Sequence, residues 1–152
     1  MIKISELAES LTAKKLGITN IPDIKKLLDL EKGRADILVP IMENFLGVQI
    51  TSCYRSEELS KAVGSSPNSC HCRAGAFAVD IISISAPLPL IAKWVQENLM
   101  YHKIILERYG TRTECLHISI VYDGENKKLQ YVQHGVDREY YPVDNFENYL
   151  RD

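Results

Sequence analysis

A single carboxylate inside a hydrophobic run is the feature that most constrains how this chain can fold. Residues 76–84 read Ala-Phe-Ala-Val-Asp-Ile-Ile-Ser-Ile, which is typical of a buried strand, and Asp80 lies in the middle. An ionised carboxylate is costly to bury unless a cation or several hydrogen-bond donors accompany it. The polar, Gly-containing loop at 69–75 offers a histidine, His71. Together the loop and the strand predict one half of a metal site.

The other half comes at the start of a second apolar run, in Glu114-Cys115-Leu116-His117-Ile118-Ser119. Because side chains alternate along a strand, His117 and Ser119 share one face while Leu116 and Ile118 face the core. The same alternation sets Asp80 opposite its apolar neighbours. Two imidazoles and one carboxylate suit Zn²⁺ and leave a fourth position for water. We therefore predict His71, Asp80 and His117 as zinc ligands.

Glu114 is the candidate general base, since it stands three residues before His117. On a regular strand that spacing would turn the two side chains to opposite faces. Glu114 can therefore reach a metal-bound water only if the segment 112–115 bends or is still a loop. The alternative is a solvated glutamate at the rim of the sheet.

Each proposed ligand also has an ordinary structural interpretation. His71 can be a loop histidine, Asp80 a carboxylate held by backbone donors, and His117 a histidine satisfied within the sheet. Arg55 follows a short strand in Tyr54-Arg55-Ser56, where it is either an anion or oxyanion binder or a surface charge.

Cysteines flank both histidines, which leaves a thiol-dependent hydrolase as a further hypothesis. Cys70 and Cys72 are the neighbours of His71, and Cys115 lies two residues before His117. A thiolate close to an imidazole is the arrangement that nucleophilic cysteine chemistry requires. The simpler interpretation is that all three are unreactive thiols.

Composition narrows the class of protein. A chain of 152 residues, 45% apolar and 25% charged, is expected to form one domain with a real core. The net charge of −2 gives no electrostatic case for nucleic acid or an anionic membrane as partner. The N-terminal stretch lacks an apolar signal core, so we expect synthesis in the cytoplasm.

The order of predicted elements indicates an α+β domain, with N-terminal helices packed on a small, mostly antiparallel sheet. We expect one domain over 1–135 and a C-terminal tail, 136–152, that packs on the domain or on a partner. The last two strands should form a hairpin across the turn at 123–126. The expected helices cover 5–16, 22–32, 35–46 (with a kink or a late start at Pro40), 56–63 and 87–99. The expected strands cover 48–53, 76–84, 102–107, 114–122 and 128–133.

These residues resemble the zinc D-alanyl-D-alanine carboxypeptidases and their phage endolysin relatives, metallopeptidase family fifteen, which share the Hedgehog/DD-peptidase fold. The family motif runs Ser-x-His-x-x-Gly-x-Ala-x-Asp and later Glu-x-x-His. The segment 50–56 is similar to the family's Thr-Ser-Gly-Tyr-Arg-Ser. The resemblance covers roughly residues 2–132. The matching positions are Ser69, His71, Gly75, Ala78, Asp80, Glu114 and His117.

The resemblance implies a zinc peptidase that hydrolyses peptidoglycan stem peptides containing D-amino acids, as a carboxypeptidase or an endolysin-type endopeptidase. Glu114 would be the base and Arg55 would polarise the scissile carbonyl. Tyr54, Arg55 and Ser69 would contact the substrate. Such a protein would be released by lysis or carried in a phage particle.

One departure separates the chain from the family pattern. His71 and Asp80 are nine residues apart, where the family has seven. An even insertion keeps the side-chain parity of the strand, so Asp80 can still face the metal. The longer loop must then bulge. This departure and the aromatic tail keep open an alternative: an inactive member of the fold that serves as a structural or binding module, for example in a phage.

Overall fold

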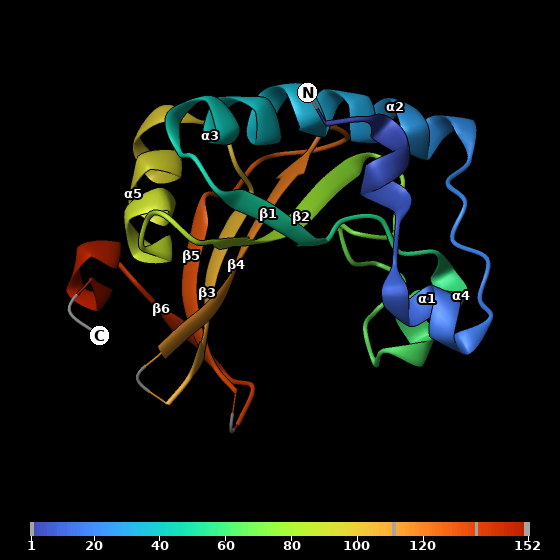
Figure 1. Ribbon diagram of the computed structural model, residues 1–152. Coiled ribbons are helices and arrows are strands. Elements are labelled where there is room, and N and C mark those ends of the chain that lie inside the picture. The colour runs from blue at the N-terminus through green and yellow to red at the C-terminus, as the bar shows by residue number, and fades with distance from the viewer. Residues whose placement is uncertain (1, 111, 136, 151–152) are drawn as a thin grey trace.

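The computed structural model describes residues 2–110, 112–135 and 137–150. Its centre is one six-stranded sheet with strand order β1-β2-β4-β3-β5-β6 (Figure 1). All neighbouring strands are antiparallel except β3 and β5. The α+β class predicted from the sequence is confirmed. The strands are β1 (Val48–Ser52), β2 (Ala76–Ser83), β3 (Lys103–Tyr109), β4 (Arg112–Val121), β5 (Leu129–His134) and β6 (Tyr140–Pro142).

The longer helices lie over one face of this sheet, and the two short helices α1 and α4 lie together beside its β1–β2 end (Figure 1). No helix in the described part of the chain is both long and apolar enough to cross a bilayer. The helical elements are η1 (Ile4–Ala8), α1 (Leu11–Leu16), α2 (Ile24–Gly33), the π-helical η2 (Arg34–Leu38), α3 (Val39–Asn44), α4 (Glu57–Ala62), α5 (Leu88–Asn98) and η3 (Phe146–Tyr149).

The N-terminal helices differ from the prediction in two places. The expected helix at 5–16 is two pieces, because Ser10 caps α1 by accepting a bond from the Ala13 amide at 3.1 Å. The expected break at Gly33 is absent: α2, η2 and α3 follow one another without a gap. A Cβ at Gly33 would lie 2.0 Å from the Phe77 ring, so this glycine permits close packing of helix on sheet rather than ending a helix.

Strand alternation divides the sheet into a core face and an open face. Ile105 of β3 and His117 of β4 face away from the helices, and Asp80 of β2 lies opposite His117 on that same face. The candidate metal ligands therefore emerge on the side that the helices leave uncovered. The buried core residues of the three central strands are Phe77, Val79, Ile81, Ile104, Leu106, Leu116, Ile118 and Ile120.

The predicted hairpin between the last two long strands is wrong. β4 already pairs with β2 on one edge and β3 on the other, so β5 has no free edge of β4 to join. The chain crosses instead to the outer edge of β3, where β5 pairs in parallel, with Lys103 opposite Leu129. The turn residues between the two apolar runs could not show that β3 already occupies the edge of β4.

The described part of the C-terminal tail packs on the domain. β6 pairs with β5, setting Tyr141 opposite Val132. Phe146, in η3, is fully buried in the main core, and η3 contacts α5. These contacts involve only the described part of the predicted tail 136–152; positions 136, 151 and 152 lie outside the described residues, and packing on a partner stays a prediction.

Candidate metal centre

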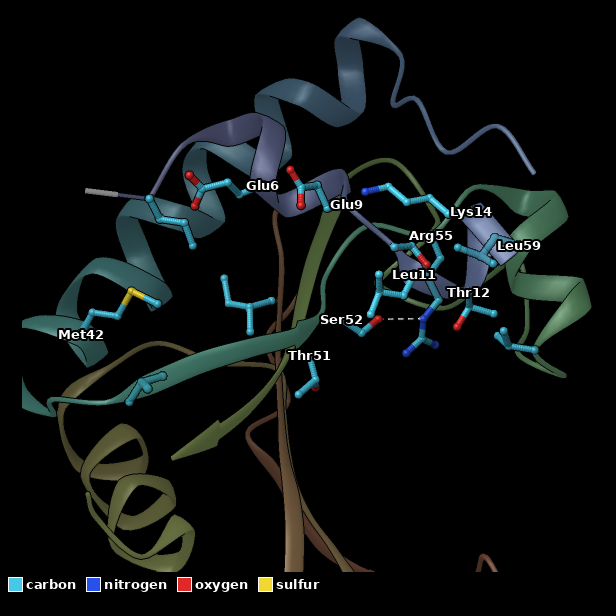
Figure 2. A pocket seen from close by; sticks show the side chains of 15 residues that line it. Glu6, Glu9, Leu11, Thr12, Lys14, Met42, Thr51, Ser52, Arg55 and Leu59 are labelled. Atoms are coloured by element: carbon cyan, nitrogen blue, oxygen red, sulfur yellow. Dashed lines mark hydrogen bonds between the residues drawn. The ribbon is translucent and has the colours of Figure 1, made fainter. Parts of the chain in front are cut away.

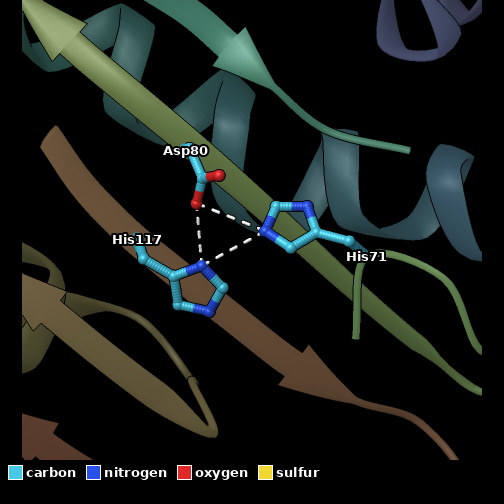
Figure 3. A group of neighbouring side chains, drawn as sticks. All are labelled: His71, Asp80 and His117. Atoms are coloured by element: carbon cyan, nitrogen blue, oxygen red, sulfur yellow. Dashed lines mark hydrogen bonds and ion pairs between the residues drawn. The ribbon is translucent and has the colours of Figure 1, made fainter. Parts of the chain in front are cut away.

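Three side chains distant in sequence converge on the open face of the sheet. The Nε2 atom of His71 lies 3.2 Å from Asp80 Oδ1, and the Nδ1 atom of His117 lies 2.8 Å from the same oxygen. The two imidazole nitrogens are 3.3 Å apart. All three atoms lie within 4.8 Å of one another, as Figure 3 shows. Nitrogen and carboxylate oxygen are the donors that Zn²⁺ accepts, so the residues present fit this ion.

Strand pairing brings two of these ligands together. Asp80 of β2 and His117 of β4 are direct cross-strand partners. Opposite residues in an antiparallel pair have side chains on the same face, with Cβ atoms about 5 Å apart. The convergence of Asp80 and His117 is thus fixed by the register of the two central strands.

The third ligand comes from the loop before β2, and helix α2 holds this loop in place. The Lys26 ammonium, only 3% exposed, donates to the carbonyls of Cys70 (2.9 Å), Arg73 (2.8 Å) and Ala76 (2.7 Å). Asp29, one turn further on, accepts from the Gly75 amide at 2.8 Å. The enlarged loop between His71 and Asp80 is therefore tied down by a buried lysine.

Hydrogen bonding orients the His71 ring for metal binding. Its Nδ1 donates to the backbone carbonyl of Cys53, which leaves the lone pair on Nε2, the atom that faces Asp80 and His117. Burial lowers the pKa of His71, with the Asp80 carboxylate opposing that effect. A neutral imidazole with its lone pair turned to the cluster is the form that binds a metal.

Asp80 is held as a carboxylate by its neighbours. Burial alone would raise the Asp80 pKa, but the positive charge of His71 and His117 when protonated, and the hydrogen bonds that they then donate, hold the Asp80 pKa well below its ordinary value. Arg55 Nη2 lies 2.9 Å from Asp80 Oδ2, and Arg55 Nε donates to Ser52 Oγ at 3.0 Å. The register of β1 shifts between Ile50 and Ser52, a bulge beside the site. Arg55 therefore contacts the side of Asp80 that faces away from the histidines.

Glu114 is the extra residue of a second bulge. Glu107 pairs with Cys115 and Arg108 pairs with Thr113, so the register of β3 and β4 shifts at Glu114. The bend that its role as a base required is therefore present, because a bulge turns two successive side chains toward one face. Glu114 lines the same hollow, of about 910 Å³, as the three proposed ligands.

Glu107 is a second carboxylate in this hollow, and sequence reasoning missed it. Strand parity places it on the same face as His117, two positions along β3 from Ile105. Burial raises the pKa of Glu107, and the negative charge of Asp80 raises it further. No motif marks this residue. The alternation of Ile104, Ile105 and Leu106 would have shown that it faces the ligands.

The two remaining predicted contact residues occupy different places. Ser69 lines the hollow, and its Oγ accepts from the His71 amide at 3.3 Å, which shapes the loop. Tyr54 is 9% exposed and belongs to the core cluster, and it is not among the residues that line the hollow. Its backbone bonds to Leu7 and Asn20 connect the N-terminal segment to the site.

The cysteine chemistry suggested by the sequence has little support at Cys115. Burial raises the pKa of this thiol to about 12, and the charges of Asp80 and Glu107 add to the shift. Burial likewise raises the pKa of Cys53. Both groups are protonated at neutral pH, and a protonated thiol is a poor nucleophile.

A His-Asp-His cluster on the uncovered face of an antiparallel sheet, bordered by carboxylates and an arginine, is an arrangement typical of the class of metal-dependent hydrolases. Comparison with known proteins agrees with this class. The Peptidase M15 family profile matches residues 1–119, and the chain belongs to this family. No curated protein and no solved structure gave a significant match. The family suggests a peptide hydrolase, typically zinc-dependent, that acts on peptidoglycan.

Proposed function

We propose that this protein is a zinc peptidase that hydrolyses peptidoglycan stem peptides containing D-amino acids, as a D-Ala-D-Ala carboxypeptidase or an endolysin-type endopeptidase. The observation that carries the proposal is the convergence of His71 Nε2, Asp80 Oδ1 and His117 Nδ1 within 4.8 Å. The match of the family profile over residues 1–119 supports it independently.

When bound by His71, Asp80 and His117, Zn²⁺ would supply a Lewis acid and lower the pKa of a water molecule. Glu114 then accepts the proton of the attacking water and returns it to the leaving amine. Arg55 keeps Asp80 charged and presents positive charge to the oxygen of the scissile carbonyl. Ser69 orders the loop that carries His71. The amide bond breaks without a covalent enzyme intermediate.

Glu107 competes with Glu114 for the role of base. Burial raises the Glu107 pKa toward neutral pH. A group whose pKa lies near the working pH accepts and returns a proton most easily. Glu114 has the position that the family motif gives to the base, so we assign it this role. Substitution of each residue separately decides between them.

An inactive binding module is the alternative function. Its two motives were the enlarged loop and the aromatic tail. Lys26 and Asp29 hold the loop so that His71 still reaches Asp80, and Phe146 buries the tail in the core of the same domain. Both observations favour the enzyme. Release by lysis or carriage in a phage particle stays a prediction about where it acts.

The test combines metal analysis with digestion of purified peptidoglycan. Protein prepared without added metal is expected to contain, or take up, about one zinc per chain. His117→Ala should abolish uptake, and chelation should stop the release of fragments detected by mass spectrometry. The mass of the released fragment identifies the broken bond.

Two results would contradict the proposal. One is a wild-type protein that takes up no zinc. The other is zinc-loaded protein that leaves peptidoglycan and synthetic stem peptides intact while remaining folded, which would favour the binding module.

A further inference from the structure

A groove of about 1020 Å³ runs along β1, outside the hollow that holds the metal ligands. The strand forms one wall through Val48, Ile50, Thr51 and Ser52. The N-terminal segment forms much of the opposite wall, including Glu6, Glu9, Leu11, Thr12 and Lys14, as Figure 2 shows. The proposed mechanism uses none of these N-terminal residues.

β1 is an edge strand, and its outward backbone groups face this groove. The Ile84 amide donates to the Gly47 carbonyl, which makes Gly47 and Ile84 a hydrogen-bonded pair one position along the ladder from Val48 and Ser83. Hydrogen-bonded and non-bonded pairs alternate in antiparallel sheets. The pairs Val48–Ser83 and Ile50–Ile81 are therefore non-bonded, and the amides and carbonyls of Val48 and Ile50 point away from β2.

Nothing else in the described chain occupies this edge. The sheet ends at β1, and no backbone hydrogen bond from another described segment reaches Val48 or Ile50. An edge of this kind is a template for an added strand. Peptide recognition by strand addition draws affinity from the main chain and specificity from pockets on either side.

The groove leads into the candidate active site. Arg55 lines both the groove and the metal hollow, and its guanidinium contacts Asp80 at 2.9 Å. A chain lying along β1 toward Ser52 therefore arrives at Arg55 and the proposed ligands. Glu6 and Glu9 on the wall suit a basic side chain, while Ile50 and Leu11 offer apolar contact.

We propose that this groove is the subsite for the peptide chain of the substrate, which adds to β1 as an extended strand beside Val48 and Ile50. The inference rests on the proposed peptidase function and extends it from the cleaved bond to the adjoining residues. β1 has five residues, about 16 Å of strand, which accommodates several residues of an extended peptide. Residues 6–14 limit the space beside β1. A single extended peptide fits this space more readily than the edge of a second sheet does.

The first test compares substrates of different length. A pentapeptide stem fills the groove, whereas N-acetyl-D-Ala-D-Ala is too short to do so. Leu11→Asp alters an exposed groove residue, and Leu28→Asp alters an exposed leucine outside the groove as the control. We expect Leu11→Asp to raise the pentapeptide KM about tenfold or more, equivalent to 1.4 kcal/mol, and to leave the short substrate and zinc content unchanged.

The second test measures hydrogen exchange of the Val48 and Ile50 amides in zinc-loaded wild-type protein with the pentapeptide added. Slower exchange at these two amides supports strand addition, even if no bond is cut. Exchange unchanged by saturating peptide, or Leu11→Asp affecting both substrates equally, would overturn the proposal.

Two further outcomes distinguish failure of the subsite from failure of the peptidase function. Wild-type protein that cuts neither substrate contradicts the peptidase function, and the exchange measurement then judges the groove by itself. Protection of Val48 and Ile50 that rises with protein concentration, without peptide and with dimers in sedimentation, would assign the edge to a second copy of this chain and refute the subsite.

Discussion

The Arg55 guanidinium lies 2.9 Å from Asp80 Oδ2, while Oδ1 of the same carboxylate faces both histidines. Asp80 therefore turns one oxygen, Oδ1, toward the candidate cation position and pairs the other, Oδ2, with the fixed positive charge of Arg55. Partners of ligating groups that do not touch the metal orient the ligand and tune its charge. In the proposed peptidase this arrangement would link metal binding and catalysis through one side chain.

Arg55→Lys is expected to weaken zinc binding by roughly 10- to 100-fold and to lower kcat as well. A lysine has a single ammonium and cannot bond Ser52 and Asp80 in the geometry of the guanidinium fork. Chelator competition measures the affinity, and steady-state kinetics measure kcat. Lys61→Arg, an exposed exchange on α4, is the control. Unchanged zinc affinity would show that Arg55 does not orient Asp80.

Lys26→Met is expected to lower the free energy of unfolding by about 3 kcal/mol, since buried carbonyls of the His71 loop lose their donor. It should also weaken zinc binding, because this loop carries a ligand. Urea denaturation and zinc titration provide the two measurements.

Lys25→Met is the matched control, one residue earlier on the exposed side of α2, and should leave both quantities nearly unchanged. A Lys26→Met protein that binds zinc normally would mean that the loop holds its shape without α2.

Gly33→Ala is expected to destabilise the fold by about 1–3 kcal/mol, because the new methyl group would overlap the Phe77 ring. Thermal denaturation measures the effect. Gly124→Ala is the control, since a Cβ there meets nothing within 4 Å. If the alanine proved stabilising, as it commonly is in a helix interior, the close approach of α2 to β2 would be refuted.

Glu114→Gln is expected to lower kcat by roughly 10²- to 10⁴-fold with zinc still bound, since general base catalysis contributes about that much. Glu107→Gln should reduce kcat less. The two variants are assayed side by side on a stem peptide, with zinc content measured in each. The reverse order of effects would transfer the role of base to Glu107.

Glu107 also predicts a pH dependence of stability in zinc-free protein. Burial raises its folded pKa above the usual 4.5, so between these two values the folded state binds the extra proton. The stability linked to Glu107 is thus present at acid pH and is lost as pH rises through the folded pKa. We expect Glu107→Gln to be more stable than wild type at pH 8, with the difference shrinking toward pH 4.

Urea denaturation at both pH values checks this, and Glu43→Gln, at an exposed position on α3, is the control. A stability difference that does not vary with pH would show that Glu107 ionises as it would in the unfolded chain.

Sequence patterns were informative where chemistry and local geometry coincide. A carboxylate inside a buried strand, Asp80, predicted that partners lie nearby, and the alternation of side chains around His117 indicated one of them. Gly33 was misinterpreted because its role is steric contact with Phe77, which no local pattern reports. The predicted pairing of β5 was wrong because strand pairing depends on which strand edges remain free, and this is a property of the whole sheet.

Glu107 illustrates the remaining difficulty. It is a lone glutamate at the end of an apolar strand, and such a residue is usually solvated. Only the pairing of β3 with β4 places it beside the ligands. The bulge at Glu114 was anticipated as a requirement, yet the sequence could not show that the strand would supply it.

The direct pairing of Asp80 with His117 has a consequence for how the molecule folds. Slipping β2 by one residue against β4 would turn one of the two side chains into the hydrocarbon interior and scatter the cluster. An ion bound between Asp80 and His117 would therefore stabilise a single alignment of β2 and β4. The metal would then contribute to correct strand pairing during folding as well as to catalysis.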